Sequence, residues 1–522
     1  MRDIIIYFDN SIDLLPVVIF RQNGIIRIER KFHRCRTLSG AITIGYMDAV
    51  ESYRRFNTIP NFDQKRIETL FALTIGFSKG DAPKKWSFGK TEIIGRKLPK
   101  EFNSLIHKFE NAKIGWGEFS HELLLVKSDL VAAVDRAYDE LLQKYISDNP
   151  NRGQWIEIEH KVDSYFLSNQ FFGLSVDRNK VEILLRQLNN QKYSALLYLE
   201  EYFNLDISGS YLSDEYLSGL VLSKFKETEN TEELSDLLQI VNVDDKRIEA
   251  IYKVRECKID YANLIKHYSL NEENNIFPEY KTIGSSSGRI FIAAPGTQYL
   301  KKSNRDIFVA RDGYKLAYFD FRNYEPGIAA GLSNDPDFIA FYNTGDMYLK
   351  IAKEEYSDKV FRRYVKITVL ATLYGMSESS LDKYFIDTNC FDPKKTIQVL
   401  NSFTVFQRWK NKIIESALNE NKITHEMYSR IFLEKNEWKI KTSALNHLIQ
   451  STGSKILKRC IFSLMSREDM KILIPMHDAL LCEVKTENYE EKKDCIVAIM
   501  ERIFREEVIN ITSRVVVGEF GG

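Results

Sequence analysis

The stretch Ile472-Leu473-Ile474-Pro475-Met476-His477-Asp478-Ala479-Leu480-Leu481-Cys482 sets one aspartate between two apolar runs. A second apolar run, Tyr314 to Phe319, ends at Asp320. Both runs are typical of buried strands, so we predict a sheet with Asp320 at a strand end and Asp478 at a hairpin tip. A carboxylate in such a place is costly unless a cation or hydrogen bonds compensate it. Taken alone, a strand-end aspartate is more often an ordinary turn residue than a metal ligand.

A helical pattern lies between the two aspartates. Its members recur every four residues: Arg362, Lys366, Leu370 and Tyr374. This spacing puts the two cations on one face, a turn apart. Such a pair by itself often belongs to a solvated helix face. The two acidic strand ends could hold metal ions, and the cationic helix could hold phosphates. Together they are the parts of a nucleotidyl-transfer site.

Five segments, in this order along the chain, resemble the motifs of family A DNA polymerases, the bacterial DNA polymerase I family. They are Ser287-Gly288-Arg289-Ile290 with Pro295 and Gln298; Asp320-Phe321-Arg322-Asn323-Tyr324-Glu325 (motif A); Arg362-Arg363-Tyr364-Val365-Lys366 with Leu370 and Tyr374-Gly375 (motif B); Asn446-His447-Leu448-Ile449-Gln450; and His477-Asp478-Ala479 (motif C). The resemblance implies an α/β multidomain fold. A right-hand polymerase with thumb, palm and fingers would follow a ribonuclease-H-like mixed α/β domain.

The resemblance also implies a role for each motif residue. The catalytic residues would be Asp320, Asp478 and Lys366. Two Mg²⁺ ions, for which Mn²⁺ could substitute, would be bound by Asp320, Asp478 and the carbonyl of Phe321. The incoming dNTP would contact Arg362, Lys366, Leu370, Tyr374 and Glu325. The DNA primer-template would contact Arg289, Asn323, Asn446, Gln450 and His477. Purely structural roles remain alternatives for Asn446 and Gln450 (hydrogen bonds to core backbone), His477 (a turn cap) and Tyr374 (core packing).

Several positions depart from the family pattern. Asn323 stands where Gln is usual, and Gly327 where Arg is usual. Leu370 replaces an aromatic residue, and Ala479 replaces a Glu. Tyr348 takes the place of a His that contacts the triphosphate in the family, and its role is left unassigned. Because the metal ligands and the Arg/Lys pair are retained, we expect retained catalysis with altered nucleotide discrimination.

The implied domains are 1–150, a degenerate 3′–5′ exonuclease-like domain; 151–275, a helical thumb; 276–340 and 440–522, the palm; and 341–439, the fingers. In the first domain we expect strands at 4–8, 15–20 and 24–30, with a hairpin turn at Gln22-Asn23-Gly24, and helices at 62–76 and 128–146. A helix over 178–203 is expected to open the thumb.

Of the four metal-binding carboxylates of such an exonuclease, only Asp9 and Asp135 have matches, and Ser11 and His121 replace the others. Two-metal hydrolysis needs several carboxylates, so we predict that proofreading is lost. A metal site rebuilt from Asp9, His121 and Asp135 is the alternative. In the thumb, an acidic stretch over 227–245 predicts either a weakened duplex grip or a surface for a protein partner. The N-terminal domain is a second candidate surface for such a partner.

The composition suits packed domains, because 44% of the residues are apolar and 12% aromatic. At 522 residues the chain is too long for one core. No apolar run approaches ~20 residues, so we expect no membrane span and a cytoplasmic location. The six cysteines are scattered, as is typical of reduced thiols. Lys plus Arg equals Asp plus Glu at 73 each, which argues against strong nonspecific DNA binding but allows a basic cleft.

Three hypotheses for function remain open. The first is a DNA-directed DNA polymerase without proofreading, serving repair, phage or plasmid replication, or defence. The second is a template-independent or RNA-templated nucleotidyltransferase on the same fold, motivated by Asn323, Leu370 and Ala479. The third is a catalytically silent nucleic-acid-binding scaffold. The retained aspartate pair and the retained Arg/Lys pair argue against the third, since a scaffold needs neither.

Overall fold

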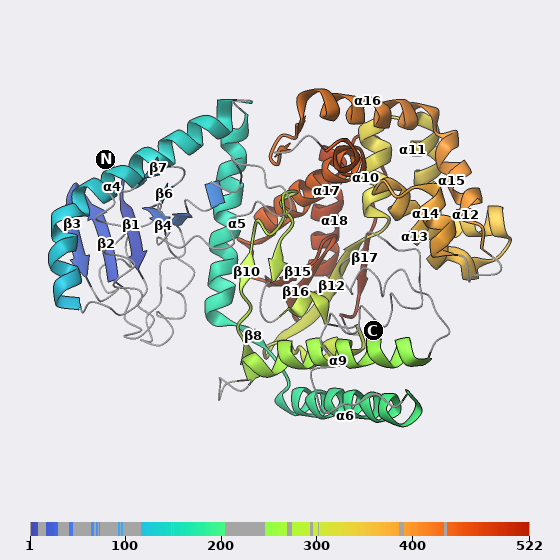
Figure 1. Ribbon diagram of the computed structural model, residues 1–522, viewed down its shortest axis with the longest axis horizontal. Helices are drawn as coiled ribbons and strands as arrows, with labels where there is room; N and C mark the ends of the chain where they lie inside the picture. The colour runs from blue at the N-terminus through green and yellow to red at the C-terminus, as the bar shows by residue number, and fades with distance from the viewer. Residues whose placement is uncertain are drawn as a thin grey trace.

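The computed structural model describes residues 2–8, 17–29, 41–44, 64–66, 69–70, 73, 92–93, 96–97, 116–147, 149, 151–203, 246–268, 274–292, 296–300, 302–385, 391–432 and 436–520. Figure 1 shows a small N-terminal sheet on one side of a long upright helix, α5 (Arg152–Phe172), and the rest of the molecule on the other side. The helix thus stands between the N-terminal sheet and the palm predicted from the sequence.

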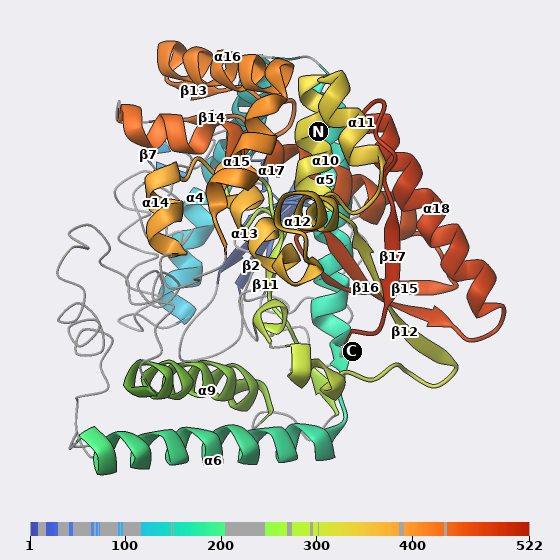
Figure 2. The same ribbon diagram turned by 90° about the vertical axis from the view of Figure 1, so that its right-hand side faces the viewer.

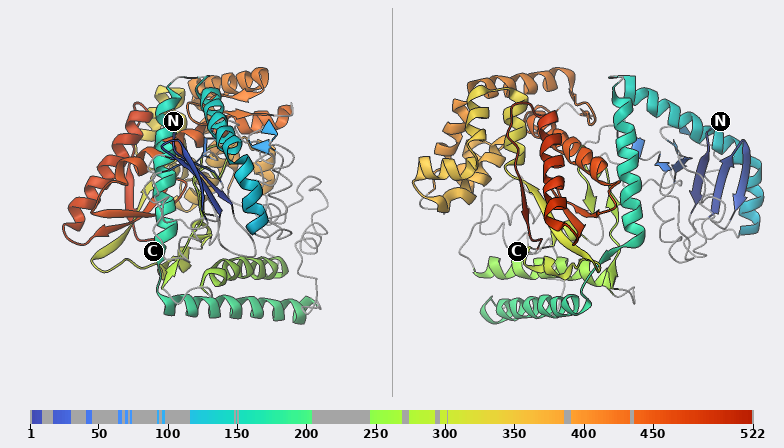
Figure 3. Two further views of the ribbon diagram at one scale, coloured as in Figure 1. Left: turned by 90° about the vertical axis from the view of Figure 1, so that its left-hand side faces the viewer. Right: turned by 180° about the vertical axis from the view of Figure 1, so that it is seen from behind.

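The N-terminal sheet has five strands in the order β3-β2-β1-β4-β5. They are β1 (Ile4–Phe8), β2 (Val17–Gln22), β3 (Ile25–Glu29), β4 (Ala41–Ile44) and β5 (Gln64–Arg66). The first three pair antiparallel, while β4 and β5 run parallel to β1. Asn23 and Gly24 both have positive φ, at 50° and 82°, which confirms the predicted hairpin turn. The helix α4 (Trp116–Ser147) packs across this sheet, as both views of Figure 3 show.

Two helix predictions in this domain need correction. The helix predicted over 62–76 is wrong at its start, because residues 64–66 form β5 and pair with β4. The triplet Gln64-Lys65-Arg66 has no strand pattern of its own, so its conformation comes from the neighbouring strand. The helix predicted from 128 begins already at Trp116. A short hairpin of β6 (Glu92–Ile93) and β7 (Arg96–Lys97) completes the described part of this domain.

The region predicted as the thumb, which we call the thumb below, contains a pair of long helices, α6 (Arg178–Phe203) and α9 (Lys246–Tyr268). The predicted helix over 178–203 is confirmed. The two helices pack along each other beneath the palm in Figures 1 and 2. They are joined to the palm where β8 (Leu174–Ser175) pairs with β9 (Asn275–Ile276). The acidic stretch 227–245 lies outside the described residues.

The region predicted as the palm, which we call the palm below, contains an antiparallel sheet in the order β15-β16-β12-β17. Its strands are β12 (Tyr314–Phe321), β15 (Met470–Pro475), β16 (Ala479–Lys485) and β17 (Val515–Gly518). The apolar runs that predicted β12, β15 and β16 are therefore confirmed as strands. Helix α18 (Tyr489–Glu507) packs on β16 and β17, and α17 (Glu437–Leu464) packs on α18 and α5. Two short strands, β10 (Tyr280–Lys281) and β11 (Phe291–Ile292), lead into the palm.

The region predicted as the fingers, which we call the fingers below, consists mainly of short helices above the palm sheet (Figure 2). They are α11 (Pro336–Asn343), α12 (Met347–Tyr356), α13 (Arg362–Leu373), α14 (Glu378–Tyr384), α15 (Pro393–Ser402) and α16 (Thr404–Glu420), followed by β13 (Lys422–Ile423) and β14 (Arg430–Ile431). Aspartates begin three of these helices: Asp335, Asp346 and Asp392 accept backbone N–H groups of the first turn. Helix α10 (Tyr324–Ser333) connects β12 to this region.

The hydrophobic interior forms two main clusters. The larger one runs through the base of the thumb, the palm and the fingers. The smaller one fills the N-terminal domain, and it includes Met427 and Tyr428 from the segment between β13 and β14. None of the described helices combines the length and apolarity needed to cross a membrane.

Candidate active site

The two predicted aspartates lie together at one edge of the palm sheet. Along β12, Ala317, Phe319 and Phe321 are buried, and the alternation of strand residues turns Asp320 to the opposite, half-buried face. Asp320 pairs with Ala479, the first residue of β16, and Asp478 directly precedes it. The Phe321 N–H also donates to the carbonyl of Asp478 at 3.1 Å. Strand pairing thus holds Asp320 and Asp478 side by side, although they are 158 positions apart in the chain.

The two carboxylates lie where negative charge is only partly compensated by neighbouring lysines. The pKa of Asp320 is raised to about 7, first by burial and next by the charge of Asp478, against the opposing charges of Lys366 and Lys302. Burial also raises the pKa of Asp478, with Lys366 again the main opposing charge and Glu325 adding to the rise. A site with this excess of negative charge favours a cation. In the described part of the chain, no three His, Cys, Asp or Glu side chains gather to hold a metal by themselves.

Three further predicted residues meet beside the aspartates. Arg289 Nη2 lies 2.6 Å from Glu325 Oε1, and the Tyr374 hydroxyl donates to Glu325 Oε2. They come from the entry to the palm, the first turn of α10 and the C-terminal end of α13. Burial, followed by the charge of Glu325, raises the pKa of Tyr374. Tyr374 therefore does more than fill the core, because its hydroxyl fixes one oxygen of Glu325 while Arg289 fixes the other.

Helix α13 carries the predicted cationic face. Lys366 is exposed and close enough to act on the pKa values of both aspartates. Arg362 lies a turn earlier, where its guanidinium pairs with Asp346 at 2.9 Å and lies 5.7 Å from the centre of the Tyr348 ring. Tyr348 itself is buried, and its pKa is raised first by burial and next by the charge of Glu325. Tyr348, to which the sequence assigns no role, therefore supports Arg362 at the rim of the site.

Gly375, just after α13, lies against Thr442 of α17. Its φ of 81° suits glycine, and a Cβ there would lie 2.8 Å from the Cα of Thr442. This close approach places the C-terminal end of α13 against α17, the helix that carries Asn446 and Gln450. Gln450 Oε1 accepts a hydrogen bond from Ser287 Oγ at 3.3 Å. Asn446 Oδ1 is buried and meets no hydrogen-bond partner among the described residues, so it is available to a ligand.

The remaining predicted DNA contacts differ in their surroundings. His477 is exposed at the hairpin tip, with its ring edge-on to Phe291 at a centroid distance of 6.1 Å. Asn323 is buried at the N-cap of α10 with φ 50°, and its Nδ2 donates to the carbonyl of Gly345 at 3.3 Å. Its place suggests support of the turn after β12, and its DNA contact stays a prediction. Pro295 lies outside the described residues. Gln298 is buried and binds backbone groups of Ile290 and Ile292.

The model of DNA polymerase family A matches residues 177–519, well over half of the chain. The chain belongs to DNA polymerase family A. It is 26% identical to DNA polymerase I of Aquifex aeolicus (strain VF5) over 56% of this chain and 54% of that protein. It is 25% identical to DNA polymerase I of Borreliella burgdorferi over 51% of this chain and 33% of that protein. This chain thus spans about a third to a half of the length of these relatives.

A solved structure confirms the fold. The POL domain of Pol1 from M. smegmatis, in complex with DNA primer-template and dNTP, superposes with a TM-score of 0.75. The match covers 100% of this chain and 96% of that one, at 16% identity. The fold is that of a DNA polymerase I polymerase domain, mixed α/β and rich in helices.

Two departures from the family A pattern have structural explanations. At Gly327, a Cβ would lie 2.7 Å from the ring and the hydroxyl of Tyr342, so Tyr342 fills the space that a side chain would need. The Tyr342 hydroxyl donates to the carbonyl of Arg322 at 3.1 Å, which keeps the ring in place. Ala479 is fully buried opposite Asp320, where a longer acidic side chain would need a different packing. Leu370 is half-buried on α13, and nothing in its contacts explains the exchange.

Asp135, the described member of the predicted exonuclease remnant, is paired with arginines. Asp135 lies on α4 with Arg2 at 2.7 Å and Arg21 at 2.5 Å. Two guanidinium groups on one carboxylate leave little negative charge for a metal ion. Asp9, Ser11 and the side chain of His121 lie outside the described residues.

Sequence reasoning missed the residues that hold the site from outside. Asp346 could have been found, since an aspartate before a helical pattern is an N-cap signal. Tyr428, Glu159 and Lys458 gave no signal, because they meet only through the fold. The Tyr428 hydroxyl donates to Glu159, whose carboxylate lies 2.8 Å from Lys458 Nζ, and all three residues are buried.

Proposed function

We propose that this chain is a DNA-directed DNA polymerase that extends a primer 3′-hydroxyl with dNTPs by two-metal nucleotidyl transfer, without proofreading. The observation that carries the proposal is the pair of half-buried carboxylates, Asp320 and Asp478, facing an exposed lysine on α13. The relative from M. smegmatis was solved with DNA primer-template and dNTP, and its fold likeness supports the same substrates here.

The residues present suit magnesium. Two carboxylates and a backbone carbonyl, that of Phe321, are hard oxygen ligands, and Mg²⁺ commonly completes its shell with water and substrate phosphates. The raised pKa values of Asp320 and Asp478 mark charge that divalent ions would neutralise. When bound, two such ions would lower the pKa of the primer hydroxyl and stabilise charge on the triphosphate.

The cationic face of α13 would handle the triphosphate. Lys366 is exposed and reaches toward both aspartates, so it would neutralise the developing charge and protonate the leaving pyrophosphate. Arg362 would grip phosphate oxygens through its planar fork after leaving Asp346. Leu370 would pack against the incoming nucleotide from the same helix face.

The cluster of Glu325, Arg289 and Tyr374 would select the sugar. Glu325 is held from two sides, so it cannot swing away when a 2′-hydroxyl approaches. Arg289, Asn446 and Gln450 would contact the minor groove, where correct pairs share acceptor positions. The orphaned Oδ1 of Asn446 supports this assignment, since a buried acceptor without a partner is costly until a ligand supplies a donor.

The N-terminal domain would be a ribonuclease-H-like exonuclease relic. Its mixed five-stranded sheet with a helix across one face supports that origin. The capture of Asp135 by Arg2 and Arg21 supports the loss of proofreading. Incubation with a mismatched primer-template, Mg²⁺ and no dNTPs should leave the 3′ end intact. Shortening that is abolished by Asp135→Ala but persists in Asp478→Ala would show a working exonuclease.

Primer extension tests the main proposal. The purified protein receives Mg²⁺, all four dNTPs and a labelled primer, either alone or annealed to a DNA or an RNA template. Extension copied from the DNA template is expected, and Asp478→Ala should abolish it. Extension of the unannealed primer, or extension on RNA only, would favour the template-independent or RNA-templated alternative. No extension in any arm, together with DNA binding, would point to the silent scaffold.

A further inference from the structure

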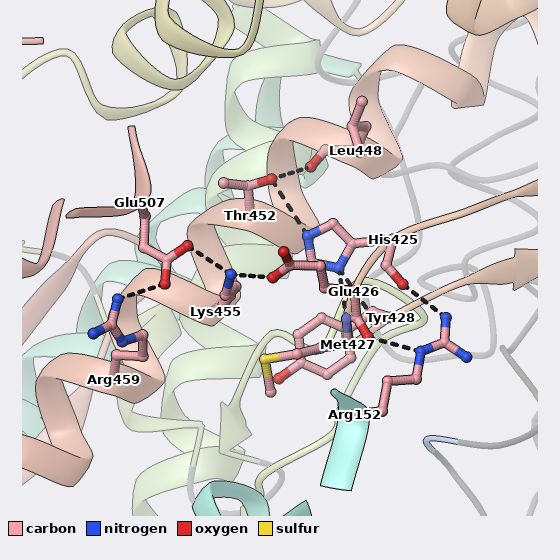
Figure 4. A network of polar contacts seen from close by, with 10 residues as sticks. All are labelled: Arg152, His425, Glu426, Met427, Tyr428, Leu448, Thr452, Lys455, Arg459 and Glu507. Atoms are coloured by element: carbon pink, nitrogen blue, oxygen red, sulfur yellow. Dashed lines mark hydrogen bonds and ion pairs between the residues drawn. The ribbon is translucent and has the colours of Figure 1, made fainter. Parts of the chain in front are cut away.

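The segment 424–429, between β13 and β14, is built into the N-terminal domain. Met427 is fully buried and Tyr428 is 3% exposed, and both belong to the N-terminal hydrophobic cluster. We call this segment the wedge. Figure 4 shows the wedge between Arg152 on one side and α17 on the other. A part of the fingers region therefore has its core contacts with a domain at the other end of the chain.

Helices α4 and α5 fix the backbone of the wedge. The Arg152 guanidinium donates to the carbonyl of Glu426 at 2.8 Å, to the carbonyl of His425 at 2.9 Å and to Ser429 Oγ at 2.7 Å (Figure 4 draws part of this network). Arg152 is 3% exposed, so these bonds are shielded from water. The Tyr145 hydroxyl donates to the Met427 carbonyl at 3.1 Å. Buried bonds to so many successive backbone groups leave the wedge a single conformation.

The other side of the wedge is held by α17. His425 Nδ1 accepts the backbone N–H groups of Met427 and Tyr428, and Lys455 pairs with Glu426 and, at 2.6 Å, with Glu507. His447 Nε2 lies 2.7 Å from the Tyr428 carbonyl, and so donates its proton there. His447 is the direct neighbour of Asn446, so the wedge touches the helix that carries a predicted DNA contact.

The Tyr428 ring lies against Gly288. A Cβ on Gly288 would lie 2.2 to 2.5 Å from three atoms of that ring, so the ring occupies the place of a side chain. Gly288 has φ 76°, and its N–H donates to the Ser285 carbonyl at 3.0 Å. The turn closes where Gly284 N–H donates to the Arg289 carbonyl at 2.8 Å. The ring therefore rests on the last residue before Arg289, which in turn holds Glu325.

Helix α5 anchors both the wedge and the start of this turn. Glu159 accepts from the Tyr428 hydroxyl and pairs with Lys458 at 2.8 Å. One turn later, Asp163 accepts from Thr282 Oγ1 at 2.6 Å and pairs with Arg66 of β5 at 3.1 Å. Glu159 and Asp163 lie four residues apart and therefore on the same helix face. That face supports the approach to Arg289 at Thr282 and, through Tyr428, at Gly288.

We propose that Tyr428 and Thr282 are positioning residues for Arg289, and that through them α5, together with the N-terminal domain packed against it, sets the sugar selectivity of the active site. The inference rests on the proposed function in that it assigns sugar selection to Glu325. Arg289 holds one oxygen of Glu325 at 2.6 Å, so a displaced turn releases Glu325 on that side. A small displacement near a reacting centre has large kinetic effects. This gives the domain a task that needs no exonuclease chemistry.

The buried ion pair beside Tyr428 is consistent with a role in positioning the turn before Arg289. The Glu159–Lys458 pair is at most 1% exposed, and such pairs add little net stability because both charges lose their hydration. Replacing a buried pair with apolar residues is often neutral or stabilising, so a pair of this kind is better explained by the geometry it imposes.

The experiment compares Tyr428→Phe, Tyr428→Ala and Thr282→Val in the full chain. The control is Tyr138→Ala, which removes a buried tyrosine from the same N-terminal cluster on α4, away from the turn. One readout is the ratio of kcat/KM for a dNTP to that for the matching rNTP. The other is hydrogen exchange at the amides of Gly284 and Gly288, which requires no catalysis. Thermal melting ranks the four variants by overall stability.

Tyr428→Phe keeps the ring on Gly288, so its selectivity and exchange should stay close to those of the unaltered protein. Tyr428→Ala should lose about 10- to 100-fold in the dNTP/rNTP ratio and should exchange the two amides faster. Thr282→Val should change both readouts in the same direction, with a smaller amplitude. Tyr138→Ala should lower the melting temperature while leaving both readouts unchanged.

Unchanged exchange at Gly284 and Gly288 in folded Tyr428→Ala and Thr282→Val would overturn the inference. So would equal loss of selectivity in Tyr138→Ala, because the effect would then follow general stability. If the unaltered protein incorporated no nucleotide, the proposed function would fail, and the exchange data alone would decide whether these residues hold the turn.

Discussion

The Arg362 guanidinium is bound to the carboxylate of Asp346, with both Nε and Nη2 at 2.9 Å from Oδ2. The other oxygen of Asp346 accepts the N–H of Leu349 at 3.1 Å and begins α12. Arg362, which the family resemblance assigns to the triphosphate, is thus paired with the residue that caps α12. Under the proposed function, a nucleotide would have to displace Asp346 to gain Arg362.

Asp346→Asn should strengthen dNTP binding. The amide oxygen can still cap α12, while the competing charge is gone. The guanidinium is 41% exposed, so the pair is worth at most about 1 kcal/mol, and KM for dNTP should fall by no more than about fivefold. Steady-state kinetics on a fixed primer-template measure the change. Asp358→Asn, at another aspartate cap, is the control and should leave KM unchanged. A higher KM in Asp346→Asn would show that Asp346 orients Arg362 for the nucleotide.

Asp320→Asn and Asp478→Asn should each abolish incorporation. Loss of a metal-holding carboxylate costs several kcal/mol of transition-state stabilisation, on the order of a thousandfold or more in rate. Single-turnover extension measures this loss, and circular dichroism shows that the fold is kept. Asp312→Asn, at an exposed aspartate just before β12, is the matched control and should extend normally. Extension within tenfold of normal by either aspartate variant would remove the catalytic assignment.

Stability without metal should depend on Asp320. Its pKa is raised from 3.8 to about 7 in the folded protein, so the folded state holds the proton more tightly than the unfolded state does. Stability should therefore fall as pH rises through this interval and level off above about pH 7. Melting curves in chelator should show this fall in the unaltered protein and a smaller one in Asp320→Asn. Saturating Mg²⁺ should reverse the sign at neutral pH, since the ions bind the deprotonated pair. A pH profile identical in both proteins would contradict the raised pKa.

The sequence was most informative where a pattern was local. Apolar runs predicted β12, β15 and β16, and four-residue spacing predicted α13 with its cationic face. Strand register then brought Asp320 and Asp478 together, as their places at strand ends had indicated. The helix prediction failed at residues 64–66 because their strand conformation depends on pairing with β4. Arg66 becomes buried against Asp163 only in the fold.

The supports of the site could not be predicted for a different reason. Glu159 meets Tyr428 across 269 residues and Lys458 across 299, and none of the three stands in a pattern of its own. A lone buried glutamate looks like any polar residue on a helix until its partners are placed. Motifs therefore located the groups that we propose to react, whereas the groups that hold them emerge only from tertiary structure.

Lys366→Ala and Arg362→Ala should separate chemistry from binding. Lys366 acts on both aspartates, so its loss should lower the maximal incorporation rate strongly with little change in apparent dNTP affinity. Arg362 lies at the rim, bound to Asp346, so its loss should mainly raise the apparent Kd for dNTP. Pre-steady-state titration of dNTP gives both quantities. Arg363→Ala, at an exposed neighbour on α13, is the control. If Lys366→Ala and Arg362→Ala were both silent, α13 would be an ordinary surface helix.

Gly327→Ala should destabilise the fingers–palm junction. The added Cβ would lie 2.7 Å from the Tyr342 ring, which its hydrogen bond to the Arg322 carbonyl keeps from moving. Overpacking of this kind costs about 1–3 kcal/mol. Denaturant unfolding measures it, and Tyr342→Leu in the same chain should recover part of the loss by vacating the space. Gly153→Ala is the control, because nothing lies within 4 Å of its Cβ and a helical glycine costs up to about 1 kcal/mol, so this change should be neutral or stabilising. If Gly327→Ala were as stable as Gly153→Ala, Tyr342 would yield easily, and the loss of the usual arginine at 327 would need an explanation other than the space that Tyr342 fills.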